Sequence, residues 1–347
     1  MVDRVALRQY RSYPTLDLDL SPGIVLVVGR NGVGKTNLLE SLHLATQGFS
    51  PRTRHDAQLI RFGESAARVA VAGRRGTLPV EVSLTLREGQ AKEARLNGAR
   101  LPSAESLRRE LQTLVFTPDR LAVVKGGPAA RRAYFDRVVA RVLPARAAAP
   151  QDYAAALAQR NAALRRVQLG LSDRATLGPW TEQVAALGAE LVAARRHALE
   201  TVAPAFAERA GELGLADARL GYTAEPPSVE QLEARLPRDV ERGATGLGPH
   251  LDDVVIASGD RDLRQFGSQG EQRLAVLSLL LAEAELLETR PLLLLDDVLS
   301  ELDPGRRRVL ADRVAGMGQT MITATHPSAL PVEPAQLVEV EAGTARS

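Results

Sequence analysis

The apolar positions near the start of the chain follow two patterns typical of β-strands. Residues 2–9 and 16–20 alternate apolar and polar side chains, which predicts edge or half-buried strands. Residues 24–28 (Ile-Val-Leu-Val-Val) are all apolar, which predicts a strand covered on both faces. A glycine-rich turn and an amphipathic stretch around Leu38, Leu39 and Leu42 follow. We therefore expect a strand–loop–helix unit here.

The pattern changes further along the chain. Residues 68–97 alternate like antiparallel strands, whereas the stretch from about 128 is rich in Ala, Leu, Arg and Glu and predicts helices separated by prolines. We expect helices over 128–143, 150–169, 178–199, 203–213 and 270–289, and further buried strands over 254–257 and 292–295. The proline spacing excludes a long coiled coil, because no window sustains several heptads.

The composition is that of an ordinary folded protein. The 347 residues are 45% hydrophobic and 25% charged, enough for about two domains with a large core. The absence of cysteine excludes disulfide scaffolds, Cys-ligated metal sites and thiol nucleophiles, and five scattered histidines do not favour a His-based metal site. No signal peptide is recognisable, and the longest uncharged apolar run is about half a membrane span, so we expect a soluble cytoplasmic protein without a membrane partner.

Residues 29–36 match the phosphate-binding pattern G-x-x-x-x-G-K-[ST], as the run Gly29-Arg30-Asn31-Gly32-Val33-Gly34-Lys35-Thr36. Its glycines let backbone amides turn inward around phosphate oxygens, and the following helix points its positive end at the same anion. Lys35 is one of only three lysines among 44 basic residues. It would reach the β- and γ-phosphates, and Thr36 would ligate Mg²⁺. The alternative is a glycine-rich turn without a ligand.

Two adjacent carboxylates, Asp296 and Asp297, follow the buried strand expected over 292–295. Ligands bind at this end of the strands in open α/β sheets, and parallel neighbours would bring Asp296 close to the phosphate loop. Asp296 would hold Mg²⁺, directly or through water, and Asp297 would polarise the attacking water. Adjacent strand residues point to opposite faces, so the two cannot share one role. The alternative is a solvated acidic turn.

A third segment, Phe266-Gly267-Ser268-Gln269-Gly270-Glu271, opens the helix that precedes this acidic strand. Ser268 is a good N-cap and Gly270 allows close backbone approach. The segment resembles the signature motif of ABC-type ATPases, in which the serine and the helix N-terminus bind the γ-phosphate of ATP held by another subunit. Ser300-Glu301-Leu302-Asp303 looks like the D-loop of these proteins, and His326 follows a predicted strand as their γ-phosphate histidine does. The alternatives are an ordinary capped helix and an exposed loop histidine.

Taken together, these residues resemble the RecF family, bacterial recombination-repair ATPases related to SMC proteins but without their coiled-coil arms. The resemblance covers most of the chain. Besides the motifs above, it is carried by Asn31–Glu40, Gly48–Thr53, Leu59–Gly63, Val115–Asp119, Val124–Pro128, Arg131-Arg132, Gln159–Asn161, Gly246–His250 and Leu294–Asp303. Two points depart from the family pattern: Leu251 stands where arginine is more usual, and the glutamine of the Q-loop has no clear counterpart, although Gln112 is nearby.

The resemblance implies an α/β fold, an ABC-type ATPase head with mixed sheets, plus a mainly helical second lobe. Lobe I would comprise residues 1–120 and 289–347, and lobe II, which carries the signature motif, residues 121–288. ATP and Mg²⁺ would be the cofactors. The implied nucleotide contacts are residues 29–36 with Asn37, Ser268, Gln269, Gly270, Glu271 and Asp303; the metal ligands are Thr36 and Asp296; the catalytic residues are Lys35, Asp297 and His326.

The resemblance also implies a function. RecF proteins bind gapped or single-strand/double-strand junction DNA in an ATP-dependent manner, as an ATP-driven dimer, and act with RecR and RecO to load RecA. Another SMC-like ATPase and a transporter ATPase subunit are the alternatives. The net charge of only +2 is no nucleic-acid signature, but two segments are locally basic. These are Arg52, Arg54, Arg61, Arg68, Arg74 and Arg75, and then Arg108, Arg109, Arg120, Lys125, Arg131 and Arg132. Each segment is a candidate phosphate contact or simply a solvated face.

Overall fold

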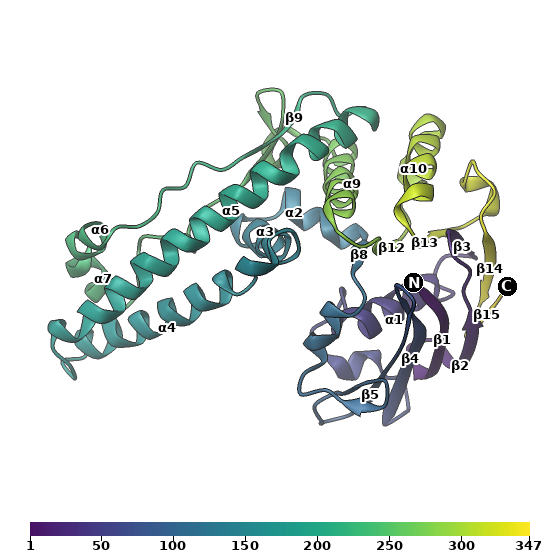
Figure 1. Cartoon of the computed structure of the whole chain (residues 1–347), viewed down its shortest axis with the longest axis horizontal. Helices are drawn as coiled ribbons and strands as arrows, with labels where there is room; N and C mark the ends of the chain where they lie inside the picture. The colour runs from purple at the N-terminus through teal and green to yellow at the C-terminus, as the bar shows by residue number, and fades with distance from the viewer. The chain divides into compact units, whose positions relative to one another are not determined.

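The computed structural model describes residues 1–347, apart from the side chains of Glu105 and Arg109. The chain divides into two compact units (Figure 1). Unit 1 comprises Met1–Arg120 and Leu287–Ser347, and unit 2 comprises Leu121–Leu286. None of the described helices is long and apolar enough to cross a membrane.

Unit 1 contains two six-stranded sheets. The first is antiparallel, with the order β2-β1-β4-β5-β6-β7. Its strands are β1 (Val2–Tyr10), β2 (Tyr13–Asp19), β4 (Ala66–Arg75), β5 (Leu78–Arg87), β6 (Glu93–Leu96) and β7 (Ala99–Arg100). The second sheet has the order β15-β14-β3-β13-β12-β8. Its strands are β3 (Ile24–Val28), β8 (Thr113–Phe116), β12 (Leu292–Leu295), β13 (Thr320–Ala324), β14 (Gln336–Glu341) and β15 (Thr344–Arg346).

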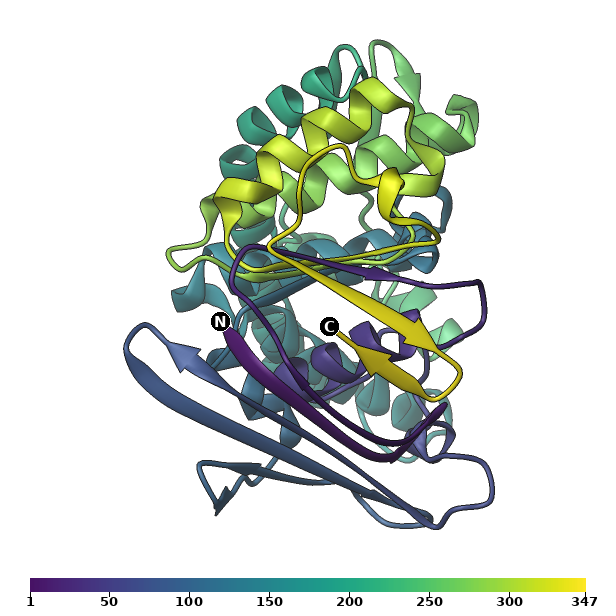
Figure 2. The same ribbon diagram turned by 90° about the vertical axis from the view of Figure 1, so that its right-hand side faces the viewer.

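Helix α1 (Lys35–Gln47) lies between the two sheets of unit 1 (Figure 2). It contacts β4 and β5 of the first sheet and β8 and β13 of the second. One hydrophobic core joins both sheets to Leu38, Leu39 and Leu42 of this helix. Helix α10 (Pro304–Met317) packs against β13 of the second sheet. This cover on both faces explains why β3 and β12 are apolar throughout and why every residue of β3, β12 and β13 is buried.

The order of the second sheet sets the geometry of the site. Strand β13 pairs in parallel with β3 on one side and with β12 on the other, and β8 pairs in parallel with β12. The carboxyl ends of β3, β13, β12 and β8 therefore share one edge of the sheet. The phosphate loop follows β3 at this edge, and Asp296 and Asp297 follow β12.

Unit 2 is mainly helical, with one small antiparallel sheet of order β11-β10-β9. Its helices are α2 (Ala122–Lys125), α3 (Pro128–Val142), α4 (Ala149–Gln168), α5 (Gly178–Glu212), α6 (Val229–Ala234), α7 (Leu236–Arg242), α8 (Leu263–Phe266) and α9 (Gln269–Leu286). Its strands are β9 (Ala218–Gly221), β10 (Val255–Ser258) and β11 (Arg261–Asp262). Helices α4 and α5 pack against each other as an elongated hairpin (Figure 1).

The predicted break between residues 199 and 203 is wrong, because α5 continues through Pro204. A proline in a helix interior removes one hydrogen bond and costs about 3 kcal/mol. The residues around it offset this cost: Leu199, Val202 and Phe206 are buried, and the helix packs along α9. Tertiary burial therefore overrides the local signal.

Two of the sequence blocks that resemble the RecF family meet inside unit 2. The Arg160 guanidinium on α4 is fully buried and donates to Asp239 Oδ2 at 2.9 Å and to Thr245 Oγ1 at 2.7 Å. The Thr245 backbone amide donates to Asn161 Oδ1 at 2.8 Å. His250 completes the network, with its ring nitrogens 2.7 Å from Tyr153 Oη and 3.0 Å from the Thr245 carbonyl oxygen. These blocks fix the loop after α7 against the helical hairpin.

Candidate nucleotide-binding site

The glycines of the phosphate loop occupy positions that a side chain would disturb. Gly32 and Gly34 have φ values of 84° and 120°, in the region that favours glycine. A Cβ on Gly34 would lie 2.6 Å from Ser12 Oγ, and one on Gly29 would lie 2.4 Å from the Val340 carbonyl oxygen. Gly34 also begins α1 without a side-chain cap, so the first amides of the helix remain available to an anion.

Lys35 reaches across the loop that precedes it. Its Nζ donates to the carbonyl oxygens of Gly29 at 2.6 Å and Arg30 at 3.0 Å. Burial lowers the pKa of Lys35, while the charges of Asp297 and Asp296 oppose that change. The ammonium group therefore lies within electrostatic reach of both carboxylates, in the loop where phosphate oxygens would bind.

Thr36 and Asp296 meet although they lie on separate elements. Thr36 Oγ1 donates to Asp296, with both carboxylate oxygens at 3.0 Å, and Thr323 Oγ1 donates to Asp296 Oδ1 at 2.9 Å. Asp296 is only 5% exposed. Burial raises the pKa of Asp296, and the hydrogen bonds from Thr323 and Thr36 partly offset that rise. The expected approach of Asp296 to the phosphate loop is thus present in the structure.

The oxygen atoms of Thr36 and Asp296 fit a hard cation such as Mg²⁺. Among the described residues, no cluster of three or more His, Asp or Glu side chains could hold a metal by itself. Mg²⁺ usually binds through one or two carboxylates together with waters and substrate phosphates. The donor set therefore fits an ion that arrives with a phosphate ligand.

Asp297 differs from Asp296 in both backbone and exposure. Strand β12 ends at Leu295, so the pair follows the strand, and Asp297 takes a left-handed conformation with φ 51°. Its backbone amide donates to Thr323 Oγ1 at 2.8 Å, and its side chain is exposed. One carboxylate is thus buried against the helix and the other faces solvent. The expected division of the pair arises from this turn and not from strand alternation.

Thr323 is a site residue that the sequence analysis missed. It is 1% exposed on β13, where its hydroxyl donates to Asp296 and accepts from the Asp297 amide. Its signal in the sequence was a threonine within a buried strand, and Thr320 of the same strand carries the same signal. Only the position of β13 between β3 and β12 shows that the Thr323 hydroxyl reaches Asp296 and Asp297.

A network of charged side chains surrounds Glu40, which lies on α1. Glu40 is buried, and its carboxylate accepts hydrogen bonds from Arg11 at 2.8 and 2.9 Å and from Ser50 at 2.6 Å. Arg52 also donates to Glu40, at 3.4 Å, and to Asn37 Oδ1 at 3.1 Å. Arg52 is thereby fixed beside the first turn of α1, and its charge acts on Asp296.

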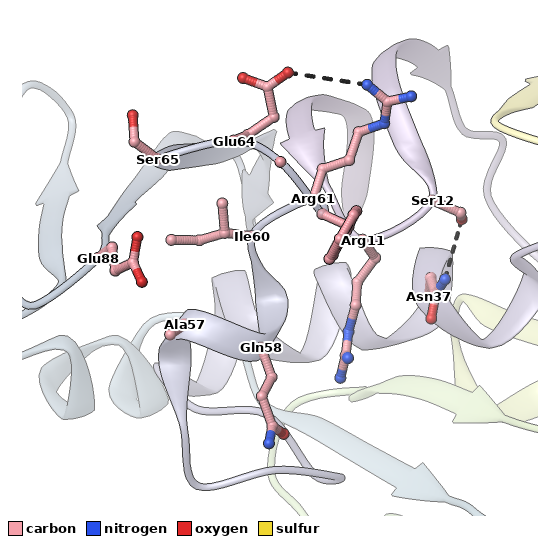
Figure 3. Close-up of a pocket in the computed structure, with 12 residues that line it drawn as sticks. Arg11, Ser12, Asn37, Ala57, Gln58, Ile60, Arg61, Glu64, Ser65 and Glu88 are labelled. Carbon is pink, nitrogen blue, oxygen red and sulfur yellow. Dashed lines mark hydrogen bonds and ion pairs between the residues drawn. The ribbon is translucent and has the colours of Figure 1, made fainter.

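A pocket of about 810 Å³ adjoins the start of α1 (Figure 3). Ser12 and Asn37 meet at one side of it, where Asn37 Nδ2 donates to Ser12 Oγ at 3.0 Å. Arg61 and Glu64 lie at another side as an ion pair with a 4.0 Å separation. Asn37, which follows the phosphate loop, is part of the lining of this pocket.

The remaining predicted site residues lie elsewhere in the two units. Ser268 is in unit 2, where its hydroxyl accepts from the Glu271 amide at 3.2 Å and the Glu271 carboxylate accepts from the Ser268 amide at 2.8 Å. This capping box begins α9 and lowers the pKa of Glu271. In unit 1, Asp303 caps α10 by accepting from the Arg306 amide at 2.9 Å.

His326 and Gln112 lie at opposite ends of the second sheet. His326 follows β13, so it is on the edge that carries Asp296; its Nδ1 is 2.8 Å from Ser328 Oγ. Gln112 precedes β8, and its Oε1 accepts from Thr289 at 2.9 Å. Because β8 is parallel to β12, Gln112 lies at the far end of the strands and cannot act as the Q-loop glutamine.

The structure reduces the number of arginines in the two basic segments that could contact DNA phosphates. Arg131 is buried and forms two 2.6 Å hydrogen bonds to Asp253, so it is not a phosphate contact. Arg74 and Arg75 are paired with Asp3 and Glu110. Arg54 and Arg68 are exposed, and the side chain of Arg109 lies outside the described residues.

The comparisons with known proteins agree with this arrangement. The RecF/RecN/SMC N terminal domain family matches residues 1–344. The DNA replication and repair protein RecF of Frankia alni is 38% identical, with 95% of this chain and 94% of that protein covered. The corresponding protein of Heliobacterium modesticaldum is 36% identical, with 94% of this chain and 92% of that protein covered.

Solved structures give the same result. The recombination mediator protein RecF with ATP, in the RecFOR pathway, has a TM-score of 0.88 and 27% identity, over 99% of this chain and 96% of that one. An SMC head bound to the winged-helix domain of ScpA has a TM-score of 0.64 and 17% identity, over 99% of this chain and 96% of that one, which shows a shared fold alone. The prediction of an ABC-type ATPase head with a mainly helical second lobe and no long coiled coil is therefore confirmed. From sequence and structure together, the chain belongs to the RecF family, whose curated members are DNA replication and repair proteins.

Proposed function

We propose that the chain is an ATP-dependent DNA-binding protein of recombinational and replication-gap repair that hydrolyses ATP weakly and is stimulated by DNA. The observation that carries this is the meeting of Thr36, Asp296 and Thr323 beside a glycine loop that leaves helix amides free. The similar RecF structure with bound ATP supports ATP as the ligand.

Different residues of unit 1 bind the phosphates, hold the metal ion, accept the proton and receive the nucleoside. The loop amides and Lys35 bind the β- and γ-phosphates, and Thr36 and Asp296 hold Mg²⁺. When bound there, Mg²⁺ would supply positive charge against the charge that develops on the phosphates during hydrolysis. Asp297, which is exposed and close to Lys35, accepts a proton from the attacking water. The pocket beside Asn37 and Ser12 receives the nucleoside.

A second copy of the chain completes the site. Ser268, Gln269, Gly270 and Glu271 would contact the γ-phosphate bound by the partner, with Asp303 and His326 close to the same nucleotide. The position of Ser268 at the N-terminus of the long helix α9 supports this role, since a helix N-terminus favours an anion. ATP binding thus closes a dimer and hydrolysis opens it.

On DNA, this dimer would bind gaps or single-strand/double-strand junctions without sequence specificity. It would act with RecR and RecO to help load RecA. The RecFOR pathway of the similar solved structures supports RecR and RecO as partners. The family of the curated relatives supports DNA repair over transport.

Sedimentation with and without ATP and gapped DNA tests the proposal. We expect a monomer without ATP, a dimer with ATP, and a larger complex when gapped DNA is added. ATP hydrolysis should rise with DNA, and immobilised RecR should retain the chain. If ATP changes neither the sedimentation coefficient nor the retention of DNA, the switch mechanism is wrong.

A further inference from the structure

The tip of the α4–α5 hairpin in unit 2 exposes two leucines. Leu169 is 70% exposed and Leu171 is 66% exposed, and Gly170 separates them. Other leucines of this hairpin, such as Leu164 and Leu177, are buried in the usual way. Two large apolar side chains standing together at a solvent-facing tip indicate a contact surface.

The local backbone explains why these leucines face outward. Gly170 has a φ of 71° and ends α4 with a Schellman motif, in which its amide donates to the Val167 carbonyl oxygen and the Leu171 amide donates to that of Arg166. In this motif the residue in the place of Leu171 normally packs against the residue in the place of Arg166. Here that partner is an exposed arginine, so Leu171 lacks the usual apolar side chain at this position of the motif.

The tip is also an ordered structure. Asp173 Oδ1 caps the next turn by accepting from the Ala175 amide at 2.8 Å, and Ser172 Oγ lies 3.1 Å from Thr176 Oγ1. Both ends of the connection are thus closed by hydrogen bonds. A surface fixed in advance loses little conformational entropy on binding.

Exposed arginines surround the leucines. Arg165 and Arg166 lie in the last turn of α4, Arg174 follows the tip, and Arg242 ends α7. Helix α7 is held next to α4 because Gln168 Nε2 donates to the Glu241 carbonyl oxygen at 2.6 Å. Within the described part of the chain, none of these four arginines forms an ion pair.

This lack of ion pairs distinguishes the tip from much of the rest of the chain. Arg4, Arg8, Arg74 and Arg95, for example, are exposed but each contacts a carboxylate. Two acidic groups lie beside these arginines: Asp173, which is engaged as a cap and precedes Arg174, and Glu241, which precedes Arg242 on α7. The tip therefore carries a net positive charge that suits a polyanion.

We propose that this tip contacts the junction of double-stranded and single-stranded DNA. The arginines bind backbone phosphates, and Leu169 and Leu171 pack against the last base pair of the duplex, whose outer face has lost its stacking neighbour. Apolar side chains that contact unstacked bases beside cationic ones are a known mode of DNA binding. A continuous duplex offers phosphates but no such apolar face. This inference rests on the proposed DNA-binding function and specifies which surface recognises the junction.

Two double variants separate the two components. Leu169→Ser with Leu171→Ser should weaken binding to a gapped duplex on the order of tenfold and leave binding to an ungapped, hairpin-capped duplex unchanged, because only the junction exposes a base face. Arg165→Gln with Arg166→Gln should weaken binding to both DNAs. It should also reduce the slope of log K against log salt by about two, because each arginine that no longer neutralises a phosphate accounts for about one.

Matched controls lie in unit 1. Leu78 is also 66% exposed, so Leu78→Ser tests the loss of an exposed leucine; Arg100→Gln with Arg346→Gln removes two exposed charges elsewhere. In the parent protein, 2-aminopurine placed in the terminal base pair should change its fluorescence on binding. This change should be lost in the leucine double variant and kept in Leu78→Ser.

The outcomes are distinguishable. If the parent binds gapped DNA and both tip variants bind it with the parent affinity and salt slope, the inference is overturned and the tip is left for a protein partner. If the leucine variant loses equal affinity for both DNAs, junction recognition by the leucines is refuted. If the parent itself does not bind gapped DNA, the proposed function fails together with this inference.

Discussion

Replacing Thr323 with valine tests how the two sides of the nucleotide site are joined. The threonine hydroxyl donates to Asp296 and accepts the amide of Asp297, and the residue is 1% exposed. Valine has nearly the same shape but has no hydroxyl. The change therefore removes two hydrogen bonds without opening a cavity.

The expected loss follows from these two bonds. A hydrogen bond to a charged group contributes about 1.5–3 kcal/mol, and leaving an amide unsatisfied costs about 1–3 kcal/mol. The Asp297 amide is only partly buried, so water can replace part of its lost bond. We expect Thr323→Val to lower the free energy of unfolding by about 2–4 kcal/mol. Since Asp296 is oriented by this hydroxyl, Mg²⁺-dependent ATP hydrolysis should fall about 10–100-fold, as for other residues that orient a metal ligand.

Hydrogen exchange of the peptides that cover β12 and β13 measures the stability change locally, and steady-state ATP hydrolysis at varied Mg²⁺ measures the functional one. Thr323→Ser is the matched control, because it keeps the hydroxyl and loses only a methyl group. The reasoning is refuted if Thr323→Val changes the opening free energy by less than about 1 kcal/mol, below the smallest loss expected for the bond to Asp296. It is refuted equally if serine and valine have the same effect.

Four further substitutions test the other roles at the site. Lys35→Met should abolish nucleotide binding in calorimetry, because the phosphate-loop motif directs this lysine at the β- and γ-phosphates; unchanged affinity would contradict the phosphate-loop assignment. Asp297→Asn should still bind ATP but hydrolyse it very slowly and sediment as a stable dimer, and hydrolysis at the parent rate would place the base elsewhere. Burial raises the pKa of Asp296, so the folded chain binds this proton more tightly than the unfolded chain does. In Mg²⁺-free buffer the free energy of unfolding should therefore fall as pH rises from the ordinary aspartate pKa through the raised one, and Asp296→Asn should remove that part of the fall in urea titrations across this range. Ser268→Arg should leave ATP binding nearly intact but block ATP-driven dimerisation. Mixing this variant with Lys35→Met subunits should restore weak association. If Ser268→Arg dimerises normally with ATP, residues 267–273 are only a capped helix start and not a signature motif.

The local features of this protein could be predicted from the sequence because they depend on neighbouring residues. The phosphate loop needs glycines at fixed spacing, and strands covered on both faces need unbroken apolar runs. The sequence alone therefore predicted the strand and phosphate loop of residues 24–36 and the strand and acidic pair of residues 292–297. The capped start of α9 is local in the same sense, since Ser268 and Glu271 bond to each other's backbone amides. The resemblance to one family added the fold of the whole chain.

Contacts between distant segments were decided only by the tertiary structure. Thr323 joins the site because β13 is inserted between β3 and β12, an order that no local pattern encodes. Gln112 is excluded because β8 runs parallel to β12 and places it at the wrong end. Pro204 stays within α5 because the burial of its neighbours offsets a local penalty. In each case the deciding free energy comes from packing between residues far apart in sequence, which short-range propensity does not contain.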